Sequence, residues 1–340
     1  MASGKPLKKS ILLAALFAAG IIIMIVSLGV GSSGLGLSDF FRLLFTGGDS
    51  PEKAILFNIR FPRVILSYLV GAGLSVSGAV LQGLFKNPMA DPHVLGVSSG
   101  AGLGAAAFIV FGGAGIAASG GLIALCAFSG GIIGVYAVYL ISGAGRRSSS
   151  IVALLLSGIA VSSLLTALIS LLMVANRAKM DKIILWTMGS FTSAGWGNVI
   201  WAAGPIVLGC IGCIFFSRDL NIMLLGEEEA RQLGVDLKNT RRILLLLTTL
   251  ITGCAVAFCG IIGFVGLIVP HMVRMAAGPD HKWLLPASFL GGGAFLTLVD
   301  TLARTVASPL EIPIGILTAL CGVPFFLYLL TKHRRRGRAV

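Results

Sequence analysis

Between positions 94 and 145 the sequence reads VLGVSSGAGLGAAAFIVFGGAGIAASGGLIALCAFSGGIIGVYAVYLISGAG, and none of these 52 residues carries a formal charge. A helix needs about 20 apolar residues to cross the hydrocarbon core of a membrane, so the stretch is too long for one span. The glycine-rich residues 112–121 lie near its middle and favour a reversal of the chain. The stretch therefore predicts two membrane-spanning helices joined by a glycine-rich turn.

The composition of the whole chain agrees with a membrane location. Only 11% of the residues are charged and 56% are hydrophobic, whereas about a quarter of a typical soluble domain is charged. The net charge of +13 is spread over short clusters between apolar runs, which is typical of loops kept in the cytoplasm and argues against nucleic-acid binding. The six cysteines lie inside apolar runs. Even the C-x-x-C pair of Cys210 and Cys213 has no histidine or carboxylate nearby, so we predict packing residues and no metal site.

Dividing the uncharged runs by the length of a span predicts ten transmembrane helices in an all-α polytopic protein. The spans are expected at 11–31, 64–85, twice within 94–145, at 151–175, 198–216, twice within 243–273, at 284–303 and at 313–330. A short interfacial helix is expected at 183–191, and the 243–273 run is expected to turn at 260–263 between a full and a short span. We interpret the first run as a retained span rather than a cleaved signal peptide.

The distribution of basic residues supports this layout. With the amino terminus inside, 18 of the 26 Lys and Arg residues fall on the cytoplasmic side and 8 on the other, as the positive-inside rule requires. Both termini are then cytoplasmic, and residues 1–340 are expected to form a single transmembrane domain. Spans two to five run opposite to spans seven to ten, which is consistent with an inverted repeat. Gly96, Gly100 and Gly104 recur every four residues and predict a face for close helix packing.

Residues 218–240 form the one substantial polar, helix-prone segment between the apolar runs. Two glycines bracket a short helix in which Ala230 and Leu233 are expected to share an apolar edge, while three glutamates and an arginine face elsewhere. Such a helix is suited to the groove of a partner, although the segment could also be a solvated connection. The residues of the predicted contact are Gly226, Glu227, Glu228, Glu229, Ala230, Arg231, Leu233 and Gly234.

Three arginines, Arg60, Arg63 and Arg304, lie at the predicted outer ends of spans. One interpretation is local: they anchor helices to lipid headgroups or pair with Asp300, which is four residues before Arg304, and with the nearby Glu311. The other is that unpaired guanidiniums face outward and form a dock for an acidic partner. The residues alone leave both open.

A second candidate site at the predicted outer surface is the stretch of chain with Met173, Arg177 and Met180, with Lys179 beside it. We call this stretch the corner. It is either the mouth of a pathway that attracts an anionic ligand or a set of ordinary interfacial side chains. His93 and His271 each follow a proline, and we expect them to be hydrogen-bonded residues at helix ends rather than metal ligands.

The sequence also limits how transport could be driven. No ionisable residue lies at the middle of a predicted span, as a proton- or sodium-coupled carrier would require. No G-x-x-x-x-G-K-[ST] motif is present, so the chain lacks a P-loop for ATP. If the chain takes part in energised transport, we expect the energy to come from a different polypeptide, and an ion-coupled carrier is the alternative.

Five long segments together resemble a known family, the type II ABC importer permeases for iron complexes, haem and cobalamin. The match covers nearly the whole chain from about residue 55. The segments are FPRVILSYLVGAGLSVSGAVLQGLFKNPMADPHVLGVSSGAGLG (61–104), LGEEEARQLGV (225–235), GFVGLIVPHMVR (263–274), LPASFLGGGAFLTLVDTLAR (285–304) and EIPIGILTALCGVPFF (311–326).

The resemblance implies a homodimer of ten-span subunits in the bacterial cytoplasmic (inner) membrane. It also implies two cytoplasmic ATPases that bind ATP and Mg²⁺, no cofactor or catalytic residue in this chain, and a soluble extracytoplasmic binding protein. Residues 226–234 match the coupling helices that sit in the ATPase cleft, and Arg60, Arg63 and Arg304 match outward arginines that meet acidic residues of the binding protein. The fifth and tenth spans would line the pathway. The expected cargo is a bulky metal chelate, an iron-siderophore or haem, with cobalamin as the alternative.

Overall fold

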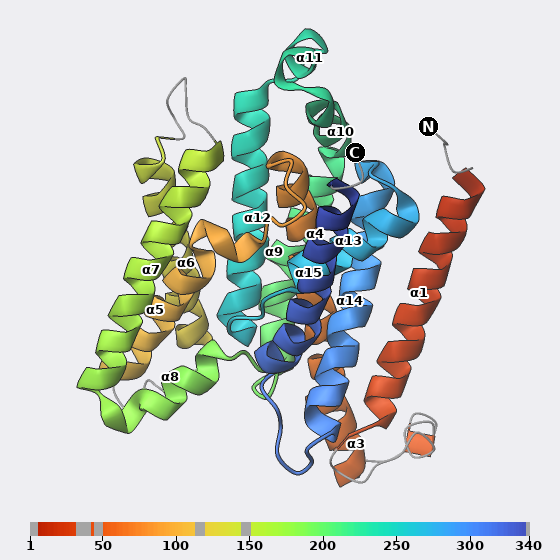
Figure 1. The fold of residues 1–340 in the computed structure, drawn as a ribbon. Helices are drawn as coiled ribbons and strands as arrows, with labels where there is room; N and C mark the ends of the chain where they lie inside the picture. Colours follow the sequence, from red (N-terminus) through yellow and green to blue (C-terminus); the bar gives the residue numbers. More distant parts are fainter. Residues whose placement is uncertain (1–5, 32–41, 44–49, 113–119, 144–150, 338–340) are drawn as a thin grey trace.

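The computed structural model describes residues 6–31, 42–43, 50–112, 120–143 and 151–337. Within these ranges every regular element is a helix. Most run roughly parallel or antiparallel to one another in an elongated bundle, with the short α10 and α11 at one end and α3 and α8 at the other (Figure 1). The first turn of α1 and the last turn of α15 lie toward the α10–α11 end.

Seven helical segments are long and apolar enough to cross a membrane. They comprise α1 (Pro6–Gly29), α4 (Phe61–Leu84) with its leading turns α3 (Pro51–Ile55) and η1 (Leu56–Arg60), α6 (Gly120–Ile141), α7 (Ile151–Ala175), α9 (Trp196–Phe215), α12 (Leu237–Cys259) and α14 (His281–Thr305). Three shorter apolar helices, α5 (Val97–Phe111), α13 (Val265–Ala277) and the first part of α15 (Ile314–Gly337), occupy the places of the remaining expected spans. The membrane class of the fold is therefore confirmed, and seven of the ten expected spans have the length for a full crossing.

Helix α4 lies at the centre of the bundle, and most of its residues are buried. It packs against α14, α9, α13 and α12. The close approach depends on glycine, because a Cβ at Gly71 would overlap the carbonyl oxygen of Gly292, and one at Gly78 would overlap that of Gly266. Between helices in a membrane, small residues allow the backbone contact that replaces a hydrophobic driving force.

The predicted glycine face of α5 is used in the same way against α6. Gly100 lies against the carbonyl oxygen of Gly130, and Gly104 lies against that of Cys126. Gly96 has another role, since it precedes the helix with a φ of 83°, in the left-handed region that favours glycine. The turn expected at residues 112–121 lies mostly outside the described residues.

The short helices α5 and α13 each follow a break in the membrane-spanning part. The first break contains the 3-10 turn η2 (Pro92–Leu95), and the second is the predicted turn at residues 260–263, which separates α12 from α13. The two breaks meet, because His93 makes a 2.8 Å hydrogen bond from Nε2 to the carbonyl oxygen of Ile262, and its Nδ1 contacts Ser98. The expectation of a hydrogen-bonded histidine at a helix end is confirmed for His93.

The interfacial helix before the sixth span is α8 (Met180–Thr187), so it begins and ends a few residues earlier than the expected 183–191. It ends where Gly189 adopts a φ of 74°. The early start follows from the 3-10 turn η3 (Arg177–Lys179), which leads directly into it from α7.

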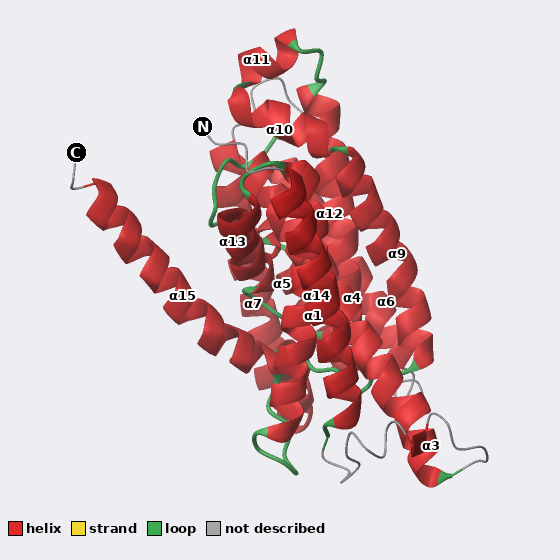
Figure 2. Cartoon of the chain, turned by 90° about the vertical axis from the view of Figure 1, so that its right-hand side faces the viewer, coloured by secondary structure: helices red, strands yellow, loops and turns green. Residues whose placement is uncertain are grey.

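Helix α15 leaves the bundle at an angle (Figure 2). Its first residues are fastened, since the backbone N–H of Ile314 donates to Gly189 at 3.1 Å and that of Gly315 donates to Met188 at 3.0 Å. Further along, Leu320 is 66% and Leu327 is 54% exposed. The start of α15 is therefore held by backbone hydrogen bonds. The Phe325 ring contacts the His271 ring of α13, while Leu320 and Leu327 remain exposed.

Candidate functional site

The polar segment at one end of the bundle folds as two short helices, α10 (Ser217–Leu225) and α11 (Glu227–Gln232). Gly226 separates them, and the Glu229 carboxylate lies so close to its Cα that a side chain at this position would overlap it. α11 ends when the N–H of Val235 donates to Ala230 at 2.9 Å, with Gly234 at a φ of 81°. The predicted glycine boundaries of this helix are confirmed.

One ion pair ties α11 to α12. Arg241 Nη2 donates to Glu227 Oε1 at 2.6 Å. The hydrogen bond from Arg241 lowers the pKa of Glu227 below its usual value of 4.5, because it favours the charged carboxylate. About half of the Glu227 side chain is exposed, so the pair is part of a solvated surface.

The predicted apolar edge of α11 is wrong. Ala230 is fully buried against the bundle, whereas Leu233 is 57% exposed. Leu225, which precedes Gly226, is 67% exposed, and Glu228, Glu229 and Arg231 also face solvent. The outer surface of this segment therefore combines acidic residues with exposed leucines, and the sequence signal for Leu225 was its position directly before the glycine.

At the opposite end of the bundle, Arg63 of α4 is held by two carboxylates. Its Nη2 lies 2.8 Å from Asp300 Oδ1 of α14, and its Nε lies 3.1 Å from both oxygens of Asp300. Its Nη1 and Nη2 each lie 3.0 Å from an oxygen of Glu311. Both contacts are bidentate, which is the geometry that a planar guanidinium forms best with a carboxylate.

The other two arginines of this cluster point into α1. Arg304 donates from Nη2 to the hydroxyl of Ser27 at 2.6 Å and to the Ser27 carbonyl, and its Nε lies 3.8 Å from Asp300. Arg60 donates from Nη1 to the carbonyl of Leu28 at 2.6 Å. A buried charge needs such partners, since an uncompensated one costs several kcal/mol.

These contacts correct the interpretation of the outer arginines as unpaired and outward-facing. Arg60 is 5%, Arg63 8% and Arg304 4% exposed, and the local pairing with Asp300 and Glu311 that the sequence left open is confirmed. The i,i+4 spacing of Asp300 and Arg304 signalled part of it. The contacts with Ser27 and Leu28 could not be read from the sequence, because they join residues far apart in the chain.

The corner at Met173, Arg177 and Met180 lies where α7 passes into α8. Arg177 is exposed, Met180 is 37% exposed, and Met173 is partly buried among residues that include Ile169 and Ile183. The neighbouring Lys179 donates to the carbonyl of Val110 at 2.7 Å, at the end of α5, where carbonyls lack helical partners. Lys179 thus links the corner to the end of α5, and Arg177 lies at the surface.

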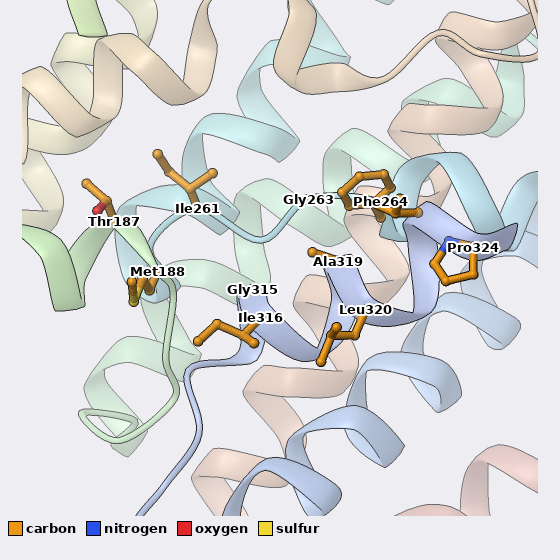
Figure 3. Close-up of a pocket in the computed structure, with 11 residues that line it drawn as sticks. Thr187, Met188, Ile261, Gly263, Phe264, Gly315, Ile316, Ala319, Leu320 and Pro324 are labelled. Carbon is orange, nitrogen blue, oxygen red and sulfur yellow. The ribbon is translucent and has the colours of Figure 1, made fainter. Parts of the chain in front are cut away.

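A pocket of about 700 Å³ lies at the other end of α8 (Figure 3). α8 and its following turn contribute Thr187 and Met188, and the break between α12 and α13 contributes Phe264. The remaining lining residues are Ile261, Gly263, Gly315, Ile316, Ala319, Leu320, Val323 and Pro324. None of these residues is charged, so the pocket offers an apolar wall with one hydroxyl.

Two details shape this pocket. Phe264 has a φ of 68°, a value that is rare for a residue other than glycine. Its ring lies against α15. Gly322 makes room for that ring, because a Cβ there would overlap it. In the sequence these residues belong to an expected turn and an expected span, because apolar residues without a motif give no signal for a pocket.

Apolar helices that are interrupted within the membrane-spanning part are typical of membrane transport proteins. Residues 18–332 match the FecCD transport family, and the chain belongs to this family of ABC importer permeases. The resemblance inferred from the five segments is confirmed.

Three similar proteins illustrate what the family carries. The chain is 46% identical to a cobalamin import system permease protein of Halobacterium salinarum, over 84% of this chain and 76% of that protein. It is 41% identical to a hemin transport system permease protein of Yersinia pestis, over 93% and 95% of the two chains. A solved structure described as an inward-facing metal-chelate type ABC transporter superposes with a TM-score of 0.83 at 36% identity, over 94% of this chain and 98% of the other.

Proposed function

We propose that this chain is the transmembrane subunit of an ATP-driven importer that moves a bulky metal chelate, an iron-siderophore or haem, into the cytoplasm. The observation that carries the proposal is the match of residues 18–332 to the FecCD transport family. The chain would act as one permease domain, with residues 218–240 as its coupling loop. It would lie in the bacterial cytoplasmic membrane with both termini inside.

The apolar pocket supports a large, partly apolar cargo. Its volume of about 700 Å³ lies within the roughly 300–1,000 Å³ of typical small-molecule sites. A hydrated metal ion would find no charged or carbonyl-lined cage among its lining residues, whereas a macrocycle could place an apolar face against Phe264 and Leu320. Cobalamin is the second candidate, since the 46% identical relative is a cobalamin permease.

We infer that the working unit contains a second copy of this chain. The apolar side chains exposed on α7 and α15 support this, because Leu164, Leu171, Leu320 and Leu327 are 54–66% exposed and patches of this kind mark contacts with lipid or protein. The pathway would run between the copies, with α7 and α15 along it. The corner at Met173, Arg177 and Met180 would lie at its outer mouth.

The two halves of the chain support an inverted ten-span repeat. In α4 to α7 the helix lengths are 24, 15, 22 and 25 residues, and in α12 to α15 they are 23, 13, 25 and 24. Both halves thus follow the order long, short, long, long. Repeats of opposite orientation with breaks near the midplane are a frequent transporter architecture.

The energy would come from two cytoplasmic ATPase subunits that bind ATP and Mg²⁺, while this chain itself would hold no cofactor and catalyse no reaction. The coupling contact would be the segment from Gly226 to Gly234, through its acidic residues, Arg231 and the exposed Leu233. An extracytoplasmic binding protein would deliver the cargo at the end that contains Arg60, Arg63 and Arg304.

Reconstitution tests this proposal. Proteoliposomes containing the chain with its ATPases and binding protein should take up haem, a ferric siderophore or cobalamin only when ATP is supplied, and comparison of the three cargoes identifies the preferred one. Liposomes containing the chain alone should be inactive under an imposed proton or sodium gradient. Gradient-driven uptake without the ATPases would instead establish the ion-coupled carrier.

A further inference from the structure

The Arg63 guanidinium binds two carboxylates that differ in their access to water. Asp300 occupies the edge formed by Nε and Nη2, and Glu311 occupies the edge formed by Nη1 and Nη2. The Asp300 side chain is fully buried, whereas 32% of the Glu311 side chain is exposed. One edge of the guanidinium is therefore sealed in the bundle, and the other is covered only by a residue at the surface.

The chain around Glu311 would allow its side chain to leave without disturbing the core. The connection between α14 and α15 projects from the end of the bundle opposite α11 (Figure 1). Its base is closed by a 3.0 Å hydrogen bond from the N–H of Ile312 to the carbonyl of Ala303. Within the connection, Val306 is 68% and Leu310 is 75% exposed, so an apolar surface that a partner could cover lies beside the ion pair.

The charges define what kind of partner could replace Glu311. Arg63 and Arg304 carry two positive charges, and Asp300 and Glu311 carry two negative charges in contact with them. When Glu311 leaves, the outward edge of Arg63 loses its compensating carboxylate. A partner carboxylate restores the balance and can form the same bidentate contact, whereas a neutral or basic surface cannot.

We propose that Glu311 is an internal competitor for docking: it occupies the outward edge of Arg63 until an acidic residue of the binding protein takes its place. This inference rests on the proposed docking role of the outer arginines. In the resting permease Glu311 would neutralise the outward edge of Arg63, and a partner would gain the Arg63 contact only by exchanging one carboxylate for another. Glu311 would thus weaken docking by every partner and favour those with a carboxylate in the right place.

Binding measurements test the exchange directly. The permease with its ATPases is placed in nanodiscs, and the Kd of its binding protein is measured at low and at physiological salt. Glu311→Gln should tighten binding by roughly threefold to tenfold at low salt, the range expected when a partly exposed ion pair no longer competes. Glu311→Asp keeps the charge and should stay close to the wild type, and Asp181→Asn, an exposed acid of α8, should leave the Kd unchanged. Arg63→Gln should weaken binding.

The outcomes separate the exchange from docking itself. If Arg60→Gln and Arg63→Gln both leave the Kd unchanged, the docking proposal fails, and the exchange fails with it. If Arg63→Gln weakens binding but Glu311→Gln does not tighten it, only the exchange is overturned.

A partner-free measurement gives a second check. Phenylglyoxal modifies accessible guanidiniums, and mass spectrometry of the peptide that contains Arg63 reports its rate of modification. We expect faster modification in Glu311→Gln than in the wild type, with similar thermal unfolding midpoints showing that both are folded. Equal rates would show that Glu311 does not cover this edge and would overturn the proposal.

Discussion

The two charged ends of this molecule are built in opposite ways. At the α3 end of the bundle, Arg63, Asp300 and Arg304 are buried and held by multiple contacts. At the α11 end, Glu228, Glu229 and Arg231 face solvent, and the ion pair between Arg241 and Glu227 joins side chains that are 27% and 51% exposed. The same residue types therefore serve mainly as structure at one end and as accessible surface at the other, and burial decides which.

Removing a buried charge should have the largest effect. Asp300→Asn leaves Arg63 and Arg304 without their shared carboxylate and should destabilise the protein by about 3–5 kcal/mol, the usual cost of breaking a buried ion pair. The measurement is the thermal unfolding midpoint of the purified protein, together with the yield of monodisperse material. The double variant Asp300→Asn with Arg63→Gln should lose less than the sum of the two single changes, because the charges are removed together. An unfolding midpoint of Asp300→Asn equal to that of the wild type would show that the buried charges do not contribute more to stability than the exposed ones.

The coupling end should respond in transport rather than in stability. Changing Glu227, Glu228 and Glu229 together to Ala should lower ATP-driven uptake roughly tenfold, as expected if about 1.4 kcal/mol of the contact with the ATPase is lost. Membrane insertion and the unfolding midpoint should stay close to the wild type. Asp181→Ala, at the opposite end, is the matched control. Normal uptake in the triple variant would count against the coupling role of α11.

A matched ion-pair deletion at the exposed end should cost little. Arg241→Gln removes the partner of Glu227 and should destabilise the protein by less than about 1 kcal/mol, as is usual for pairs open to water. The unfolding midpoint, measured beside that of Asp300→Asn, shows the difference directly. A loss as large as that of Asp300→Asn would mean that exposure does not govern the strength of these pairs.

The smallest effect concerns pH. Because Arg241 holds the pKa of Glu227 below 4.5 in the folded protein, its contribution to stability is present above the unfolded pKa and is lost as the pH falls through the lower folded pKa. The difference in midpoint between the wild type and Arg241→Gln should therefore be constant between about pH 6 and 8 and shrink below about pH 4. A difference that grew on acidification would contradict this sign.

The sequence predicted those parts of the fold that depend on apolar length. Uncharged runs predict the helices, and the run at 243–273 predicts a long and a short helix that turn near Gly260, as observed. The exact start of α8 was missed because η3 leads directly into it, and local polarity does not report such a continuation.

The candidate sites could be predicted only where residues close together in the sequence determine the structure. Gly226 and Gly234 marked the limits of α11 because glycine favours helix boundaries. The opposite orientations of Ala230 and Leu233 depend on how α11 sits on the bundle, which its own sequence does not contain. The pairing of Arg63 with Asp300 joins residues 237 positions apart, and the pocket arises where three distant apolar segments meet.

The angle at which α15 leaves the bundle (Figure 2) has a geometric consequence. A helix of 24 residues is about 36 Å long at 1.5 Å per residue. If it pivots about the hydrogen bonds at Met188 and Gly189, a tilt of about 10° displaces its far end by roughly 6 Å, about one helical turn. These hydrogen bonds lie only a few residues after Glu311 in the sequence, so a small change of angle at the start of α15 displaces its far end by several ångströms.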